Sequence, residues 1–565
     1  MLTVPVPADF ETAIARGTRS ESGAPGPRYW QQRVRYEIEA ELDPKSTVLR
    51  GAERIVYQNN SPDTLGTIVL HLYQNVFSEG VQRNRAVQIT GGTTLERVAV
   101  GGQALAARAV NASGPGYSVQ GTIGRVTLPR PLLPGDSTVL EIEWQQKVPP
   151  SGTFRTAWQD ALGGRAFQVA QWYPQIAVYD DVHGWDASPY LGDGEFYLEY
   201  GDFDVAITVP AGWLVGATGE LQNAAEVLTS EARRRLTAAL ASDSITHVVT
   251  EADLGANNAT QPAEAGQLTW RFRAENVRDF AFATSDRYVW DATRARVPAA
   301  EPGGPARTVA VHALYRPGAL HWEQAARFGQ HTLELFSRDL GPYLYPQLTI
   351  AEGSVGGMEY PQFVFIGKPE QERSLYGVIA HEVAHQWLPM MVGPAEAAYA
   401  WLDEGFASYY DALATADFYH EAADPLAAER RGYLAVAGKR EEVPMMRHTD
   451  LVLPYGARTV AAYRKPAVML GALRTLLGDS SYTAALDTFM GEWLLKHPTP
   501  WDFFHTVERV SGRNLDWFFE PWYFTTGVLD QAISSVDTST AGMVQVTVRD
   551  LGSNPMPAYV VATLA

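Results

Sequence analysis

Apolar and polar residues alternate with period two over most of the first half of this chain. Residues 35–42 and 67–72 show the pattern, and turn-forming residues such as Asn59 to Asp63 separate such segments. Strict alternation is typical of half-buried β-strands. The same pattern predicts strands at 124–128, 138–144, 203–209, 268–272 and 279–284. We therefore expect one large antiparallel β domain over residues 28–290, with a short helix at 230–242. Residues 1–27 are interpreted as a loose leader.

From about Arg307 the apolar positions recur at helical spacing. Residues 320–339 predict a helix that Gly341 and Pro342 end. Further helices are predicted around two motifs described below and at 462–477, 481–495 and 500–525. After Gly527 the β pattern returns at 531–536, 544–548 and 558–563. The expected fold class is multidomain α+β, with a mainly helical domain at 291–528 and a short or truncated β segment at 529–565.

Composition narrows the range of partners. With 565 residues the chain is too long for one core, and 46% hydrophobic content is typical of globular proteins. The 64 acidic residues exceed the 45 basic ones, for a net charge of −19. This charge argues against nucleic acid or an anionic membrane as partner and is compatible with attraction of an amine.

The sequence lacks cysteine, an apolar run long enough to span a membrane and a visible signal peptide, and each absence narrows the expected metal ligands or the expected compartment. The chain has no cysteine, so disulfides and thiolate metal ligands are excluded. No run of about 18 apolar residues predicts a transmembrane helix. The first thirty residues show no basic segment followed by an apolar stretch, so no signal peptide is visible. By default we expect a cytoplasmic protein, with an exported mature form as the alternative.

The residues 381–385 read H-E-V-A-H. On a helix this spacing places His381 and His385 on one face, with Glu382 between them. Glu404 lies nineteen positions beyond His385, far enough for a second helix to supply a third ligand. Two histidines and one carboxylate leave the fourth tetrahedral position open, which is typical of a hydrolytic site with one Zn²⁺. The alternative is a helix with one buried histidine and a solvated Glu382, but the apolar flanks make unpaired polar groups costly.

Five separated motifs resemble the aminopeptidase N and leukotriene-hydrolase family of gluzincin zinc metallopeptidases. In chain order they are G-G-M-E-Y at 356–360, H-E-V-A-H-Q-W at 381–387, L-D-E-G-F-A at 402–407, Y-R-K-P-A at 463–467 and L-D-W-F-F-E-P-W at 515–522. The departures from the family pattern are Gly357 for Ala, Tyr360 for Asn, Asp403 for Asn and Pro466 for Gly. The resemblance implies a thermolysin-like catalytic domain in a minimal form without the family's long helical C-terminal domain.

The resemblance also implies catalytic roles. Glu382 would act as the general base, and Tyr463 would hydrogen-bond the oxyanion in the transition state. Tyr455, eight residues earlier, competes for the second role. The implied reaction is hydrolysis of the N-terminal residue from a peptide.

The motif at 356–360 implies the substrate contacts. Glu359 would pair with the free N-terminal ammonium of the peptide, and Gly356, Gly357 and Met358 would lie against its backbone. In the family a glutamine of the β domain helps to bind this amine. Gln168 and Gln171 are both candidates, and their spacing does not choose between them.

Three alternatives remain open at this point. An epoxide hydrolase or bifunctional enzyme of the same family would need a lipid tunnel, which the sequence does not show. An endopeptidase could use the same zinc chemistry, but a Glu359 that binds a free amine disfavours it. A scaffold on an inactive peptidase fold is disfavoured because His381, Glu382, His385 and Glu404 are all present.

Overall fold

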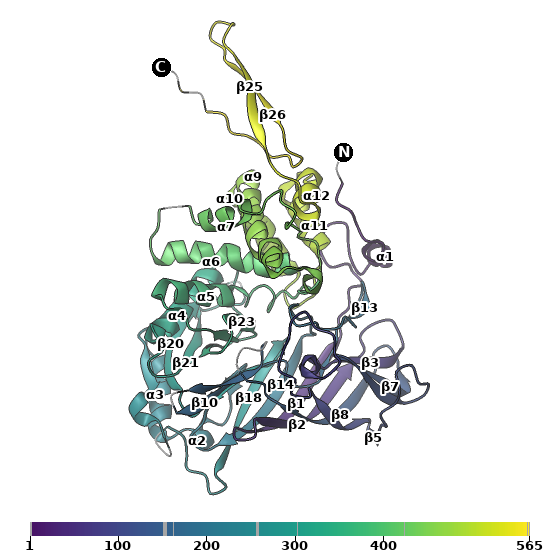
Figure 1. Ribbon diagram of the computed structural model, residues 1–565, viewed down its shortest axis with the longest axis vertical. Coiled ribbons are helices and arrows are strands. Elements are labelled where there is room, and N and C mark those ends of the chain that lie inside the picture. Colours follow the sequence, from purple (N-terminus) through teal and green to yellow (C-terminus); the bar gives the residue numbers. More distant parts are fainter. Residues whose placement is uncertain are drawn as a thin grey trace.

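A computed structural model describes residues 3–150, 155–161, 163–255, 259–301, 303–422, 424–561 and 563. A β-rich part, drawn at the bottom of Figure 1, is followed by a helical part above it and by a hairpin that projects from the helices. This arrangement confirms the predicted α+β class and the order of its parts. Within the described residues, no helix combines the length and the apolar character needed to cross a membrane.

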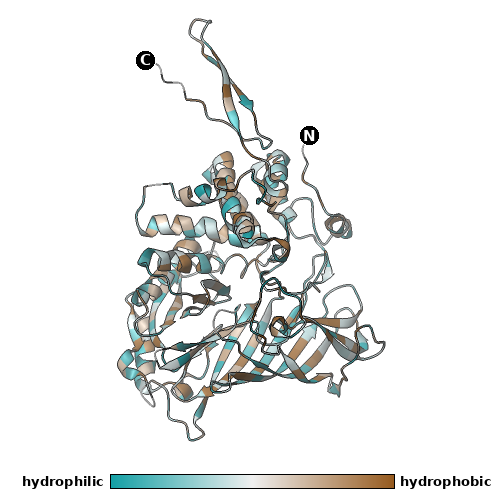
Figure 2. Cartoon of the chain, viewed as in Figure 1, coloured by the Kyte–Doolittle hydropathy of each residue, from teal (hydrophilic) through white to brown (hydrophobic). Residues whose placement is uncertain are grey.

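The β-rich part is built on an eight-stranded sheet. Its strand order is β16 (Glu220–Leu221), β18 (Gln267–Val277), β14 (Gly201–Pro210), β1 (Arg33–Asp43), β2 (Val48–Gln58), β8 (Ser137–Lys147), β4 (Thr94–Val100) and β5 (Gln103–Ala104). All neighbouring pairs are antiparallel except β1 and β14, which run parallel, so the expectation of a purely antiparallel sheet was wrong at that pair. Figure 2 shows brown and teal alternating along these strands, because one face is packed against the core.

Two four-stranded sheets and two helices complete this part. One sheet has the order β15 (Leu214–Ala217), β19 (Phe282–Ser285), β10 (Gly164–Val169) and β9 (Ala157–Ala161). The other has the order β11 (Gln175–Ile176), β3 (Leu65–His71), β7 (Ile123–Leu132) and β6 (Gly116–Gln120). A small ribbon pairs β12 (Tyr179–Asp180) with β13 (Gly184–Trp185), and the predicted helix is α3 (Ser230–Leu240), preceded by α2 (Ala224–Val227).

A buried carboxylate interrupts the core face of β2. Glu53 is 4% exposed, and neither of its carboxylate oxygens has a hydrogen-bond partner among the residues described. Burial raises the pKa of Glu53 well above its ordinary value of 4.5. The folded state therefore holds the proton more tightly than the unfolded state, so Glu53 increasingly destabilises the fold as the pH rises above 4.5.

We expect Glu53→Gln to remove this pH dependence. At pH 8 the variant should melt about 2–5 °C above the wild type, and the difference should shrink as the pH falls toward 4.5. Thermal unfolding followed by circular dichroism between pH 4.5 and pH 8.5 measures it. Glu39→Gln, on the exposed face of neighbouring β1, is the control and should leave the profile unchanged. Parallel pH profiles of Glu53→Gln and the wild type would contradict the prediction.

The helical part begins with a sheet that the sequence pattern did not reveal. Its order is β17 (Thr246–Val249), β20 (Val289–Val297), β21 (Arg307–Tyr315), β22 (Gln347–Glu352), β24 (Phe363–Ile366) and β23 (Gly357–Tyr360). The prediction that helical structure begins at Arg307 was therefore wrong. All six residues of β22 are buried, and β22 runs parallel to both β21 and β24. A strand that is covered on both faces has no alternation to detect.

Helices cover this sheet and follow it. They are α4 (Ala325–Asp339), α5 (Glu372–Ala384), α6 (Glu404–Phe418), α7 (Ala427–Leu434), α8 (Tyr455–Arg458), α9 (Lys465–Leu477), α10 (Asp479–Glu492), α11 (Pro500–Ser511) and α12 (Asp516–Phe524). A π-helical turn, Thr459–Arg464, joins α8 to α9. The single helix predicted at 500–525 is two helices, because Gly512 ends α11 with φ +66°, a conformation that suits glycine.

The N-terminal residues differ from the expected loose leader. Residues 1 and 2 lie outside the described part, and α1 (Ala8–Arg16) follows them. Arg19 is 2% exposed and pairs with Asp181 of the β-rich part at 2.6 Å and with Asp502 of α11 at 2.7 Å. The segment thus holds the two parts together. Both partners of Arg19 are far away in sequence, so no local pattern reports this contact.

The C-terminal hairpin pairs β25 (Gln531–Asp537) with β26 (Gln545–Asp550). It extends away from the helices in Figure 1. Both strands were predicted. The third predicted strand, at 558–563, is not formed at 558–561 or at 563, and residue 562 lies outside the described part.

Candidate functional site

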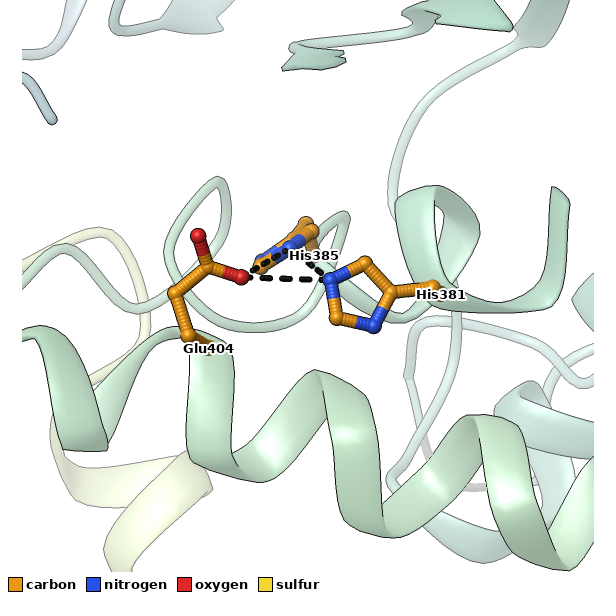
Figure 3. A group of neighbouring side chains, drawn as sticks. All are labelled: His381, His385 and Glu404. Carbon is orange, nitrogen blue, oxygen red and sulfur yellow. Dashed lines mark hydrogen bonds and ion pairs between the residues drawn. The ribbon is translucent and has the colours of Figure 1, made fainter. Parts of the chain in front are cut away.

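Two helices bring the three predicted zinc ligands together (Figure 3). His381 lies in the last turn of α5, His385 caps that helix, and Glu404 begins α6. Glu404 Oε2 lies 3.1 Å from His381 Nε2 and 3.5 Å from His385 Nε2, and the two Nε2 atoms are 3.3 Å apart. All three side chains are largely buried.

These distances fit a tetrahedral metal centre. Ligand atoms at 2.0–2.1 Å from zinc, at tetrahedral angles, are about 3.3 Å from one another, and the three atoms here are separated by 3.1 to 3.5 Å. Both Nε2 atoms point to the common centre because both Nδ1 atoms face other groups. The residues present therefore suit one Zn²⁺, as the sequence predicted.

The Nδ1 atoms of the two histidines face groups that orient the rings. His381 Nδ1 forms a hydrogen bond with Asp411 Oδ2 at 2.8 Å, and His385 Nδ1 forms one with the Leu388 carbonyl at 3.2 Å. Asp403 Oδ1 also lies 2.7 Å from His385 Nδ1. Carboxylates and carbonyls in this position fix the ring orientation and make the opposite nitrogen a better metal ligand. Neither aspartate was predicted to have this role. The sequence spacing could have identified Asp411, because it lies seven positions after Glu404 and therefore on the same face of α6.

Glu382 faces the same cavity as the ligands and is 5% exposed. Burial raises the pKa of Glu382 to about 7, a value suited to a general base. Gly357 allows it to lie there, because a Cβ atom at 357 would come within 2.0 Å of Glu382 Oε1. With the alanine that the resemblance led us to expect at this position, the Glu382 side chain would have to adopt another orientation.

Tyr463 reaches the metal-ligand cluster from the π-helical turn. Its hydroxyl donates to Glu404 Oε1, and its ring stacks on His381 with centroids 5.9 Å apart. The rival Tyr455 also lines the cavity, but it is 59% exposed. Within the described residues, a hydrogen bond to a metal ligand is found for Tyr463 and not for Tyr455.

Glu359 projects from the edge strand β23 and is 4% exposed. Its Oε1 has no hydrogen-bond partner in the part of the chain that the structure describes. Burial raises the pKa of the Glu359 carboxyl well above its usual range. One carboxylate oxygen of each of Glu359, Glu195 and Glu396 lies within 4.8 Å of the others.

Neither candidate glutamine lines the cavity. Gln168 Oε1 accepts from the Ser354 N–H at 2.9 Å, so its amide holds the loop before β23. Gln171 donates to Asp279 at 2.7 Å and accepts from the Tyr360 hydroxyl at 2.8 Å. These contacts occupy both amides in buried structure. They also provide the Tyr360 hydroxyl with a hydrogen-bond acceptor, the Gln171 amide oxygen.

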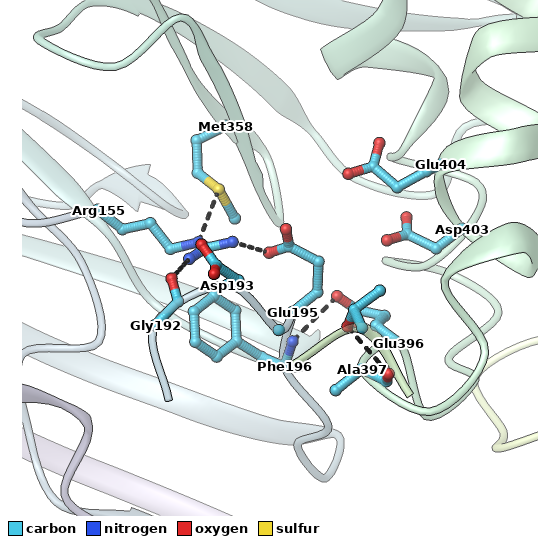
Figure 4. Close-up of polar contacts among 12 residues, drawn as sticks. Arg155, Gly192, Asp193, Glu195, Phe196, Met358, Glu396, Ala397, Asp403 and Glu404 are labelled. Carbon is cyan, nitrogen blue, oxygen red and sulfur yellow. Dashed lines mark hydrogen bonds and ion pairs between the residues drawn. The ribbon is translucent and has the colours of Figure 1, made fainter. Parts of the chain in front are cut away.

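The β-rich part instead contributes Glu195 to the cavity (Figure 4). Its carboxylate pairs with Arg155 and, at 3.0 Å, with Arg458 of α8. Glu195 could not be predicted from the sequence, because it lies in an irregular segment without a recognisable motif. Its position follows only from the docking of the two parts.

The cavity has a volume of about 690 Å³ and lies between the β-rich part and the helices. Its wall combines the metal ligands, Glu382, Tyr463 and Glu359 with the residues 354–358. Gly356, Gly357 and Met358 therefore line the cavity, and their contact with a substrate backbone stays a prediction. A space of this size is suited to a few residues of a peptide.

The comparisons with known proteins agree with this geometry. A model of the peptidase family M1 domain matches residues 342–522. Leucine aminopeptidase 2 of Aspergillus niger is 28% identical over 197 residues, which are 31% of this chain and 30% of that protein. Aminopeptidase N of Plutella xylostella is 26% identical over 226 residues, which are 36% of this chain and 24% of that protein. The chain thus spans less than a third of the length of either relative in these matches.

Solved structures share the fold over a greater length. An M1 zinc metallopeptidase from Deinococcus radiodurans superimposes with a TM-score of 0.55 at 19% identity, covering 89% of this chain and 97% of that one. A two-domain M1 zinc metallopeptidase bound to L-arginine superimposes with a TM-score of 0.56 and the same identity, 19%. The β-rich part followed by a helical part is the arrangement that they share with this chain.

Proposed function

Because this chain belongs to peptidase family M1, we propose that it is a zinc-dependent aminopeptidase that removes the N-terminal residue from peptides. The observation that carries the proposal is the juxtaposition of a metal-ligand cluster and an unpaired buried carboxylate, Glu359, in one cavity. The cluster suits hydrolysis, and the carboxylate suits an amine. Together they specify hydrolysis at the amino end of a peptide.

The residues around the ligands divide the catalytic work. When bound by His381, His385 and Glu404, zinc supplies a Lewis acid that polarises a carbonyl and acidifies water. Glu382 takes a proton from the attacking water and later delivers it to the leaving amine. The Tyr463 hydroxyl, which lies against Glu404, donates to the oxygen that becomes negative in the transition state.

Three glutamates form a cradle for the substrate amine. An ammonium that donates to three oxygens at 2.7–2.9 Å holds those oxygens about 4.5 Å apart, and oxygens of Glu195, Glu359 and Glu396 lie within 4.8 Å of one another. Glu195 and Glu396 already pair with arginines, whereas Glu359 forms no ion pair within the described residues. The substrate ammonium supplies the cation that Glu359 lacks.

Hydrolysis of paired substrates tests the proposal. A panel of aminoacyl-p-nitroanilides is assayed in free and N-acetylated form, before chelation, after chelation and after zinc is restored. We expect cleavage of the free substrates at least about 10² times faster than of the acetylated ones, loss of activity on chelation and recovery with zinc. The side-chain preference emerges from the same panel.

Three results would overturn the proposal. Equal cleavage of free and acetylated substrates would identify an endopeptidase that does not read the amine. No cleavage by a protein shown by elemental analysis to hold zinc would exclude peptide hydrolysis of this kind. Activity that survives complete removal of the metal would contradict the role of the ligand cluster.

A further inference from the structure

A loop of the β-rich part, residues 191–196, lies against the helical part, which we now call the catalytic part. This loop carries Glu195 into the cavity. We call it the Glu195 loop. It belongs to no helix or strand, so its own backbone hydrogen bonds do not fix its shape. Side chains and backbone of both parts hold it: within the β-rich part, the Asn84 N–H donates to the Leu191 carbonyl at 2.9 Å and Arg155 pairs with Glu195. Further contacts reach it from the catalytic part. This inference rests on the proposed function, because Glu195 is one of the three residues of the amine cradle.

One carboxylate of the catalytic part binds three backbone amides of this loop. Asp450 Oδ2 accepts from Leu191 N–H at 3.1 Å, and Asp450 Oδ1 accepts from Asp193 N–H at 3.0 Å and from Gly194 N–H at 2.7 Å. Asp450 is 4% exposed. Hydrogen bonds between a buried carboxylate and backbone amides are among the stronger ones in proteins. They bind the loop immediately before Glu195.

The fit of the loop is close on the same side. A Cβ atom at 194 would lie 3.0 Å from Asp450 Oδ2 and 3.2 Å from the Cβ atom of Ala397. Gly194 therefore permits the approach of the loop to Asp450. Beyond Glu195, the Phe196 N–H donates to Glu396 Oε2 at 3.3 Å (Figure 4). The loop is thus held on both sides of Glu195.

Asp450 and the cavity are also connected along the chain. Asp450 lies in the 3-10 turn Thr449–Leu451, and the chain continues directly into α8. Arg458 at the end of α8 binds the Glu195 carboxylate itself. One segment of the catalytic part therefore holds the loop through its backbone and Glu195 through its side chain. Asp450 does not line the cavity.

We propose that Asp450 is a positioning residue that fixes the Glu195 loop and thereby sets Glu195 in the amine cradle. Its effect on substrates passes through Glu195 and not through contact with the peptide. A role in stability alone would lower the melting temperature and leave the kinetic constants of the folded enzyme unchanged. Exchange of loop amides and the kinetic constants separate the two roles.

The test compares Asp450→Ala and Asp450→Asn in the full chain. Glu508→Ala is the control, because Glu508 also accepts from a backbone amide, that of Leu515 at 2.6 Å, away from the cavity. Hydrogen–deuterium exchange of peptides covering residues 188–198 reports the loop directly. Steady-state kinetics on a free aminoacyl-p-nitroanilide report KM and kcat separately.

We expect Asp450→Ala to speed exchange in the loop and to raise KM about tenfold with a smaller change in kcat. Asp450→Asn retains one acceptor oxygen, so its exchange rate in the loop and its KM should lie between those of Asp450→Ala and the wild type. This variant provides the test if Asp450→Ala does not fold. Glu508→Ala should lower the melting temperature with unchanged KM. Unchanged exchange at 188–198 in both Asp450 variants would overturn the proposal.

A double-mutant cycle with Glu195→Gln tests the route of the effect. If Asp450 acts through Glu195, Asp450→Ala should change KM by less than about twofold in the Glu195→Gln background. A full tenfold effect in that background would show that Asp450 acts by another route. If the wild type cleaves no substrate, the proposed function fails, while the exchange data still decide whether Asp450 holds the loop.

Discussion

Glu382→Gln is expected to lower kcat about 10³-fold while the protein keeps its metal. Glutamine has nearly the same shape as glutamate but accepts no proton, so the attacking water loses its base. The three ligands are untouched, and Gly357 has no Cβ atom that would press on an amide of equal size. The measurement is kcat on a free aminoacyl-p-nitroanilide, together with the zinc content of the purified variant by elemental analysis.

Glu372→Gln is the control for this substitution. Glu372 lies on the same helix, α5, but in its exposed first turn, so the change removes one charge from the helix without reaching the cavity. It should leave kcat within about twofold of the wild type. A Glu382→Gln variant with full metal and nearly wild-type kcat would remove Glu382 from the mechanism. A variant that has lost its metal would show instead that Glu382 supports the ligand cluster.

Glu359→Ala is expected to lower kcat/KM for free aminoacyl substrates about 10²–10³-fold, because the substrate ammonium would be buried without its partner. The slow cleavage of the N-acetylated substrates should hardly change, since they carry no ammonium. The preference for a free amino group should therefore largely disappear. Glu359→Gln keeps a hydrogen-bond acceptor without the charge. Its kcat/KM for free substrates should lie between the values for the wild type and for Glu359→Ala.

The matched control is Glu429→Ala. Glu429 of α7 lines the same cavity, so its removal changes the charge of the cavity by the same amount, but it lies outside the three-glutamate cradle. It should preserve the preference for free substrates. If Glu429→Ala weakens that preference as much as Glu359→Ala does, the overall negative charge of the cavity selects the amine, and Glu359 is not its anchor.

The sequence by itself determined the features that depend on local spacing. The separation of His381 and His385 by four positions on a helix fixes their common face, and the structure brings Glu404 to the same point. Strands with one exposed face, such as β1 and β8, were found because burial on one face produces alternation. The family motifs are short and continuous, so they survive in a chain that is only distantly similar to its relatives.

Only the tertiary structure decided which distant residues complete the site. Glu195 enters the cavity, and Gln168 and Gln171 do not, because docking of the two parts sets which side chains point inward. The parallel strands β22 and β24 were invisible because both of their faces are buried. Contacts between residues hundreds of positions apart, such as Asp450 with the Glu195 loop, leave no periodic trace in the sequence. Their free energy comes from groups that meet only after the chain has folded.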